Sequence, residues 1–110
     1  ACTILMNGDS VRSCLTFAVQ VDGAEIETVE SLGDAENLNP LQQAFRDHHA
    51  LQCGFCTPGF VMSMYTLLRS RSEPPTEAQI EANLAGNLCR CTGYDKIVRS
   101  VQDAAARMQN

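Results

Sequence analysis

The sequence has few basic residues and no long apolar run. Only 8 of its 110 residues are Lys or Arg, against 13 Asp and Glu, and the formal net charge is −5. Because phosphate binding requires clustered Lys and Arg, this balance argues against nucleic-acid binding. No apolar run approaches the roughly 20 residues of a membrane span, so no span is predicted. Hydrophobic residues make up 45% and charged residues 19%, which is typical of a globular protein.

The sequence also lacks an initiator Met and a visible signal peptide. It opens with Ala1-Cys2-Thr3, so we expect that it does not start at the natural N-terminus. A missing signal peptide is then uninformative. A length of 110 residues fits one domain or two small modules, and a bound metal centre would stabilise so short a chain.

The first part of the chain has a strand-like pattern. Residues 3–6 are rich in β-formers and end at Asn7-Gly8-Asp9, a tight-turn signal, across which residues 11–13 could pair. Residues 15–21 fit either a helix or a strand, and residues 25–29 alternate with a strand period. The pattern predicts the tail of a β-rich module, which gives way near residues 31–39 to a helical part.

Four helices are expected in the second part, joined by short connections as in a small bundle. Two begin at an N-cap followed by Pro, at Asn39-Pro40 and at Thr57-Pro58. A third begins at the capping box of Thr76 and Gln79. Apolar side chains at helical spacing extend the four helices over residues 40–51, 57–68, 76–88 and 92–108.

Cysteine is the residue type that points to chemistry. Two close pairs, Cys53-x₂-Cys56 and Cys89-x-Cys91, would offer four thiolates if the helices bring them together. Soft thiolates select Zn²⁺ or an iron–sulfur cluster, and the short spacing of the second pair favours iron–sulfur over zinc. A disulfide scaffold is a further alternative for a small chain with six cysteines.

The residues beside the cysteine pairs fit an anionic cluster. Thr57 and Thr92 are expected to start helices, and helix N-termini offer free N–H groups and partial positive charge to the sulfurs. A faint internal repeat relates Cys56-Thr57-Pro58-Gly59-Phe60 to Cys91-Thr92-Gly93-Tyr94. The repeat predicts two helix–loop–helix halves, each giving two thiolates to one centre.

Two segments are long enough to carry a family resemblance: Gln52-Cys53-Gly54-Phe55-Cys56-Thr57-Pro58-Gly59 and Gly86-Asn87-Leu88-Cys89-Arg90-Cys91-Thr92-Gly93-Tyr94. They resemble the small iron–sulfur subunit of molybdenum hydroxylases, in the family of xanthine oxidase, aldehyde oxidoreductase and carbon monoxide dehydrogenase. The resemblance implies a mostly helical α+β fold. Residues 35–110 would form a four-helix [2Fe–2S] domain with a pseudo-two-fold repeat. The implied ligands of its cluster are Cys53, Cys56, Cys89 and Cys91.

The same resemblance implies that residues 1–34 are the C-terminal remnant of a plant-type ferredoxin domain. Cys2 and Cys14 match the third and fourth ligands of a second [2Fe–2S] cluster, and the other two ligands would lie upstream. Gln52 and Cys91 match residues that touch the pterin of the molybdenum cofactor.

The function implied by the resemblance is electron transfer. Electrons would pass from molybdopterin in a large subunit through the clusters towards FAD in a medium subunit. The implied assembly is a cytoplasmic hetero-oligomer, with a dimer of heterotrimers as one candidate, and no catalytic residue is expected in this chain. His48 and His49 are not expected to bind metal. A structural zinc module and a free-standing ferredoxin-like carrier remain the alternative functions.

Overall fold

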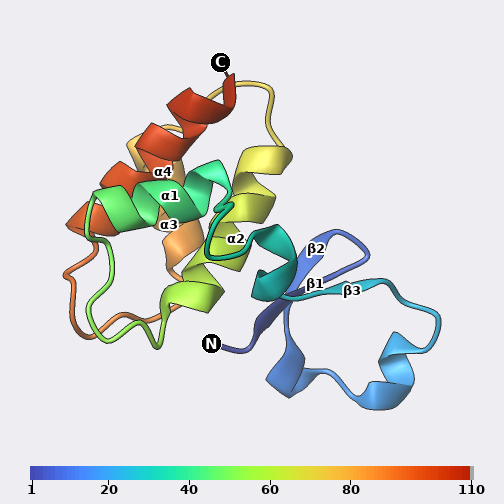
Figure 1. Ribbon diagram of the computed structural model, residues 1–110. Coiled ribbons are helices and arrows are strands. Elements are labelled where there is room, and N and C mark those ends of the chain that lie inside the picture. The colour runs from blue at the N-terminus through green and yellow to red at the C-terminus, as the bar shows by residue number, and fades with distance from the viewer. Residues whose placement is uncertain (110) are drawn as a thin grey trace.

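The computed structural model describes residues 1–109 and shows a mostly helical α+β fold. Four helices lie together on one side of the molecule, and a small sheet with its connecting loops lies on the other (Figure 1). Helix α2 touches both parts, since it packs on α1, on α3 and on the first strand. The helices are α1 (Pro40–Asp47), α2 (Thr57–Arg69), α3 (Glu77–Leu84) and α4 (Asp95–Gln109).

The sheet is antiparallel, with strand order β2-β1-β3 for β1 (Thr3–Met6), β2 (Asp9–Arg12) and β3 (Ile26–Glu27). Asn7 (φ 52°) and Gly8 (φ 87°) make the turn between β1 and β2. Two successive positive φ values suit a tight hairpin, and Asn and Gly are the residues that adopt them most readily. The predicted hairpin is therefore confirmed, with Thr3 opposite Arg12 at its open end.

The segment that the sequence left ambiguous forms short 3₁₀ turns instead of a regular helix or strand. These turns are Ser13–Leu15 and Ala18–Val21, and a third one, Val29–Leu32, follows β3. The apolar side chains of Leu15, Phe17 and Val19 are exposed, so this run does not contribute to the core.

The predicted starts of three helices are confirmed. Asn39 and Gln42 form a capping box at α1, and Thr76 and Gln79 form one at α3. Both boxes satisfy N–H groups that a helix start would otherwise leave unpaired. Helix α2 begins at Thr57, within one residue of the predicted start, but its N-cap is Cys56 and not Thr57.

The predicted ends of α1 and α3 are wrong. Helix α1 ends at Asp47, because His49 takes a φ of 53° and Ala50 N donates to Phe45 O. Leu51 and Leu88 lie outside the helices and are exposed. The last helix begins at Asp95, one residue beyond the predicted range of Thr92 to Tyr94.

The core lies among the four helices. Phe60, at the start of α2, is fully buried, and its ring meets Tyr94 edge to face with centroids 6.1 Å apart. Phe60 and Tyr94 are the aromatic positions of the two repeat segments, so the repeat meets in the core. The other fully buried large side chains of the helices are Leu41, Phe45, Met62, Met64, Ile80, Ile97 and Val101. No helix within residues 1–109 has the length and apolar character needed to cross a bilayer.

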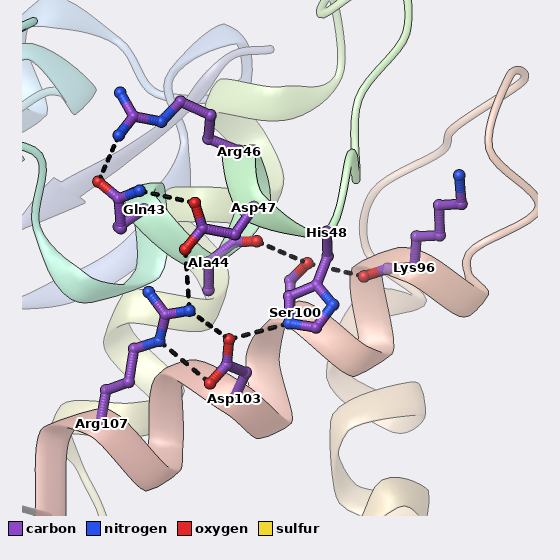
Figure 2. A network of polar contacts seen from close by, with 9 residues as sticks. All are labelled: Gln43, Ala44, Arg46, Asp47, His48, Lys96, Ser100, Asp103 and Arg107. Atoms are coloured by element: carbon purple, nitrogen blue, oxygen red, sulfur yellow. Dashed lines mark hydrogen bonds and ion pairs between the residues drawn. The ribbon is translucent and has the colours of Figure 1, made fainter.

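A polar network joins the end of α1 to α4 (Figure 2). Arg107 donates to Asp103 at 2.6 Å and to Asp47 at 2.9 Å, while His48 Nε2 lies 2.8 Å from Asp103. The buried hydroxyl of Ser100 reaches the carbonyls of Lys96 and Ala44 from the same face. His48 is thus a structural residue of this network, away from the cysteines.

This network should make stability depend on acid. Arg107 lowers the pKa of both Asp47 and Asp103 in the folded protein. The two carboxylates therefore stabilise the fold at a pH above their pKa in the unfolded chain, and this stabilisation is lost as the pH falls through their lower pKa in the folded protein. We expect Arg107→Gln to destabilise the protein at pH 7, with a difference from wild type that shrinks below about pH 4. Denaturant unfolding at several pH values measures it.

The matched control is Arg99→Gln on the same helix, whose exposed side chain pairs only with Asp95. It should leave the acid limb of the stability curve as in wild type. A constant difference between Arg107→Gln and wild type from pH 7 to pH 3 would contradict the assignment.

Candidate metal centre

Two loops bring the four predicted ligands to one cavity of about 420 Å³. Cys53 and Cys56 come from the loop before α2, and Cys89 and Cys91 from the loop between α3 and α4. Cys2, from the start of the chain, lines the same cavity. The cavity wall is completed by Ala1, Arg12, Phe55, Gly86, Asn87, Leu88 and Arg90.

The first loop is shaped by a glycine turn. Gly54 has a φ of 80°, a conformation that side chains disfavour, and its carbonyl accepts from Thr57 N at 3.3 Å. Cys56 is the residue immediately before α2, so its sulfur sits at the helix N-terminus as expected. Cys53 lies farther out and is exposed, whereas Cys56 is half-buried.

The second loop is held by Tyr94. Its hydroxyl accepts a hydrogen bond from Cys89 N at 2.9 Å, while its own N–H donates to Thr92 Oγ1 at 3.2 Å. Tyr94 and Gly93 both have a φ of 73°, which turns the chain before α4. Thr92 therefore lies in a turn, and the expected helix N-terminus after Cys91 is wrong. Thr92 nevertheless contacts the sulfur of Cys89 directly. Its N–H donates a hydrogen bond to the sulfur at 3.4 Å, and its hydroxyl lies 3.1 Å from the same atom.

The sulfurs are arranged in two pairs. Cys91 Sγ lies 3.6 Å from Cys53 Sγ, and Cys56 interacts with Cys89, since each thiol shifts the pKa of the other. All six cysteines are free, so the disulfide scaffold is not found. Within residues 1–109, no three His, Cys, Asp or Glu side chains converge as a single metal ion requires.

This arrangement fits a two-metal cluster better than one zinc ion. Two thiolates on one tetrahedral metal, with bonds of about 2.3 Å, lie about 3.8 Å apart. The Cys53–Cys91 separation of 3.6 Å is close to that value. A [2Fe–2S] cluster needs two such pairs, one for each iron, whereas a zinc site needs four sulfurs around one point.

The inner pair has unequal acidity. Burial raises the pKa of the Cys89 thiol, but hydrogen bonds from Thr92 and from the Cys91 N–H outweigh it and lower the pKa to about 7. Burial, followed by the interaction with Cys89, raises the pKa of Cys56 to about 11. Cys89 is thus the more acidic thiol of the pair and Cys56 the less acidic one. Binding a metal requires both to be deprotonated, so it must release the Cys56 proton.

The remaining predicted site residues lie nearby. Gln52 Nε2 donates to Cys91 O at 3.2 Å, so the two residues matched to pterin contact are adjacent at the surface. Cys2 Sγ lies 3.2 Å from Cys14 Sγ, and the hydrogen bond from Cys14 lowers the pKa of Cys2. Cys14, unlike Cys2, does not line the cavity that holds the four predicted ligands.

Sequence reasoning missed three residues of this site: Arg12, Asn87 and Tyr94 as a hydrogen-bond acceptor. Arg12 and Asn87 line the cavity from segments far apart in the chain. Asn87 and Tyr94 stood inside the quoted segments, but no spacing rule gave them a role. Nothing in the sequence around Arg12 indicates its contacts, because its partners are remote.

Comparison with known proteins agrees with this geometry. The family model of the [2Fe-2S] binding domain matches residues 28–102. The chain is 60% identical over 110 residues to the nicotine 6-hydroxylase small subunit of Paenarthrobacter nicotinovorans, covering all of this chain and 66% of that protein. It is 46% identical over 104 residues to the xanthine dehydrogenase iron-sulfur-binding subunit of Escherichia coli O157:H7, covering 94% of this chain and 65% of the relative.

A solved structure shares the fold as well. Quinoline 2-oxidoreductase from Pseudomonas putida 86 superposes with a TM-score of 0.91 at 49% identity. The match covers 98% of this chain and 67% of that one. The chain thus spans about two thirds of the length of these three proteins.

Proposed function

We propose that this chain, which belongs to the [2Fe-2S] binding domain family, holds one [2Fe–2S] cluster and transfers electrons. The ligands are four of the cavity cysteines: Cys53, Cys56, Cys89 and Cys91. The resemblance to small iron–sulfur subunits of molybdenum hydroxylases is confirmed by the relatives described above. One observation carries the ligand assignment. Two cysteines from the loop before α2 and two from the loop between α3 and α4 line the same cavity.

The chain's own residues prepare the site for an anionic group. Thr92 and the backbone N–H of Cys91 direct hydrogen bonds at the Cys89 sulfur and lower its pKa, which favours the deprotonated form that a metal needs. Hydrogen bonds to ligand sulfurs also tune the reduction potential. When bound, a [2Fe–2S] cluster supplies reversible electron acceptance, and the fold contributes ligation, burial and orientation.

The rim of the cavity supports docking to a partner. Phe55 is 78% exposed and Leu88 is 80% exposed, and both lie beside the cysteines. Large apolar side chains gathered at one exposed place are typical of an interaction surface. We place a molybdopterin-binding large subunit there, with Gln52 and Cys91 towards the pterin. An FAD-binding medium subunit, a dimer of heterotrimers and a cytoplasmic location complete the proposed assembly.

The pair of Cys2 and Cys14 supports a second centre. Their sulfurs lie 3.2 Å apart, close enough for both to bind one metal after a small outward movement. The family resemblance matches them to two ligands of a plant-type cluster, so we assign them to a second [2Fe–2S] cluster that needs two more cysteines. The proposed division follows, with residues 1–34 as part of a ferredoxin domain. Residues 35–110 form the four-helix domain with its pseudo-two-fold repeat, whose halves meet at Phe60 and Tyr94.

Metal analysis tests the proposal. Protein purified without oxygen should contain about two iron and two sulfide for each intact set of four cavity cysteines, and should show the absorption of a [2Fe–2S] cluster. Zinc without iron would overturn the proposal in favour of a structural module. Full cluster content with no binding to a molybdopterin subunit would favour a free carrier.

A further inference from the structure

Arg12 joins the sheet to the loop that carries two cavity cysteines. Its guanidinium donates to Thr3 Oγ1 at 2.9 Å within the sheet and to Gly86 O at 2.8 Å in the loop after α3. The second contact crosses 74 positions of sequence. A guanidinium is planar and holds its donors in a fixed fork, so two simultaneous contacts fix both its place and its orientation.

A second connection runs beside the first one. The buried hydroxyl of Thr3 donates to Asn87 Oδ1 at 3.4 Å, and Asn87 Nδ2 donates to Ser63 Oγ on α2 at 3.0 Å. Arg12 and Thr3 thus hold two neighbouring loop residues, Gly86 and Asn87. We call these four residues, together with Ser63, the Arg12 network.

Two glycines leave the space that the Arg12 network needs. A Cβ added at Gly86 would collide with the Arg12 guanidinium. A Cβ added at Gly59 on α2 would stand 2.5 Å from Asn87 Oδ1. Each glycine therefore makes room for a different side chain of the network, and neither has the positive φ that would explain a glycine on its own.

The network ends next to cysteines on both sides. Thr3 follows Cys2 and Arg12 lies two residues before Cys14, while Asn87 lies two residues before Cys89. Arg12 also lines the cavity with all four of its predicted ligands. A permanently charged guanidinium is therefore part of the wall around the proposed cluster.

We propose that Arg12 is a positioning residue that fixes the loop of Cys89 and Cys91 to the strand pair beside Cys2 and Cys14, and that sets the cluster potential with its charge. This inference rests on the proposed function, because it assumes a cluster in the cavity. Its physical basis is that a nearby positive charge favours the more negative, reduced form of an anionic centre.

Two substitutions separate the effect of the Arg12 charge from the effect of its position against Gly86. Arg12→Gln removes the charge and both contacts. Gly86→Ala keeps the charge, but its added Cβ occupies the space of the guanidinium. The group that must move is the flexible end of a side chain, so we expect the protein still to fold. Arg99→Gln is the control, since it removes an equal charge from an exposed arginine on α4.

Two measurements on the full-length protein are decisive. In cluster-free protein, Arg12→Gln should lower the folding equilibrium constant about tenfold. The double variant Arg12→Gln with Gly86→Ala should lose no more than Arg12→Gln alone, because both changes break the same contact. Arg99→Gln should change the constant by less than about twofold.

In cluster-loaded protein, Arg12→Gln should lower the cluster potential by about 28 mV, a threefold change in the reduced-to-oxidised ratio at 59 mV per tenfold. Gly86→Ala should shift the potential the same way by less, because the charge is displaced and not removed. Arg99→Gln should leave it unchanged. A purely structural Arg12 would alter stability and leave the potential where it was.

The outcomes are distinguishable. A potential unaffected by Arg12→Gln, or free energies that add in the double variant, would overturn the role of Arg12 while leaving the cluster in place. A wild-type protein that binds no iron would overturn the proposed function instead. Whether the changes in unfolding free energy of the two single variants add in the double variant can still be measured in that case, because the cluster-free protein needs no metal.

Discussion

Cys89→Ser should leave the cavity without its cluster and lower the melting temperature of purified protein to that of cluster-free wild type. Cys89 is 7% exposed, and its sulfur receives the hydrogen bonds of Thr92 and Cys91, which lower its pKa. A serine hydroxyl is a harder donor with a much higher pKa, so it replaces a soft thiolate poorly. Because metal binding and folding are coupled, the loss of the ligand is also a loss of stability.

Iron analysis and thermal unfolding measure this effect in the same sample. Cys14→Ser is the matched control, because the same chemical change is made at an exposed cysteine outside the cavity. It should leave the iron of the cavity and its contribution to melting as in wild type. Native colour and melting in Cys89→Ser would show that Cys89 is not a ligand.

Phe60→Ala should destabilise the protein by about 3–5 kcal/mol, a large part of the stability of a small domain. The Phe60 side chain is fully buried and supports the ring of Tyr94. Tyr94 in turn accepts the hydrogen bond from Cys89 N, so a cavity at Phe60 loosens the loop of the inner ligand. Cluster loss on dilution or with a chelator should accelerate as well.

Phe55→Ala separates packing from docking, because the same residue type is removed from a position that is 78% exposed. Its unfolding free energy should stay within about 0.5 kcal/mol of wild type, while binding to the partner subunit weakens. Denaturant unfolding and co-purification measure the two effects. Equal destabilisation by Phe55→Ala and Phe60→Ala would contradict the assigned core and rim.

The starts of α1 and α3 were predictable from this sequence, and the ends of the same two helices were not. A start is encoded locally, as in the capping boxes of Asn39 and Thr76, where two side chains three positions apart satisfy the backbone. The end of α1 depends on His49 adopting a positive φ, which is uncommon outside glycine and has only a weak sequence signal. Apolar periodicity then extended the predicted helices to Leu51 and Leu88, which are exposed.

The site divides in the same way. Cys53 and Cys56 were found because close spacing of soft ligands is a local pattern, and the same holds for Cys89 and Cys91. Arg12 was missed because its contact with Gly86 depends on the tertiary fold. The start of α4 was placed too early, since Thr92 resembles an N-cap while its hydroxyl faces Cys89.

The exposed rim of the cavity has a consequence for cluster assembly. Phe55 and Leu88 line the cavity and are the side chains that the proposed partner would cover. If the partner docks there, iron and sulfide would be loaded before association. Until then, Cys53 and Cys91 face solvent only 3.6 Å apart, where an oxidant could join them and close the site to metal.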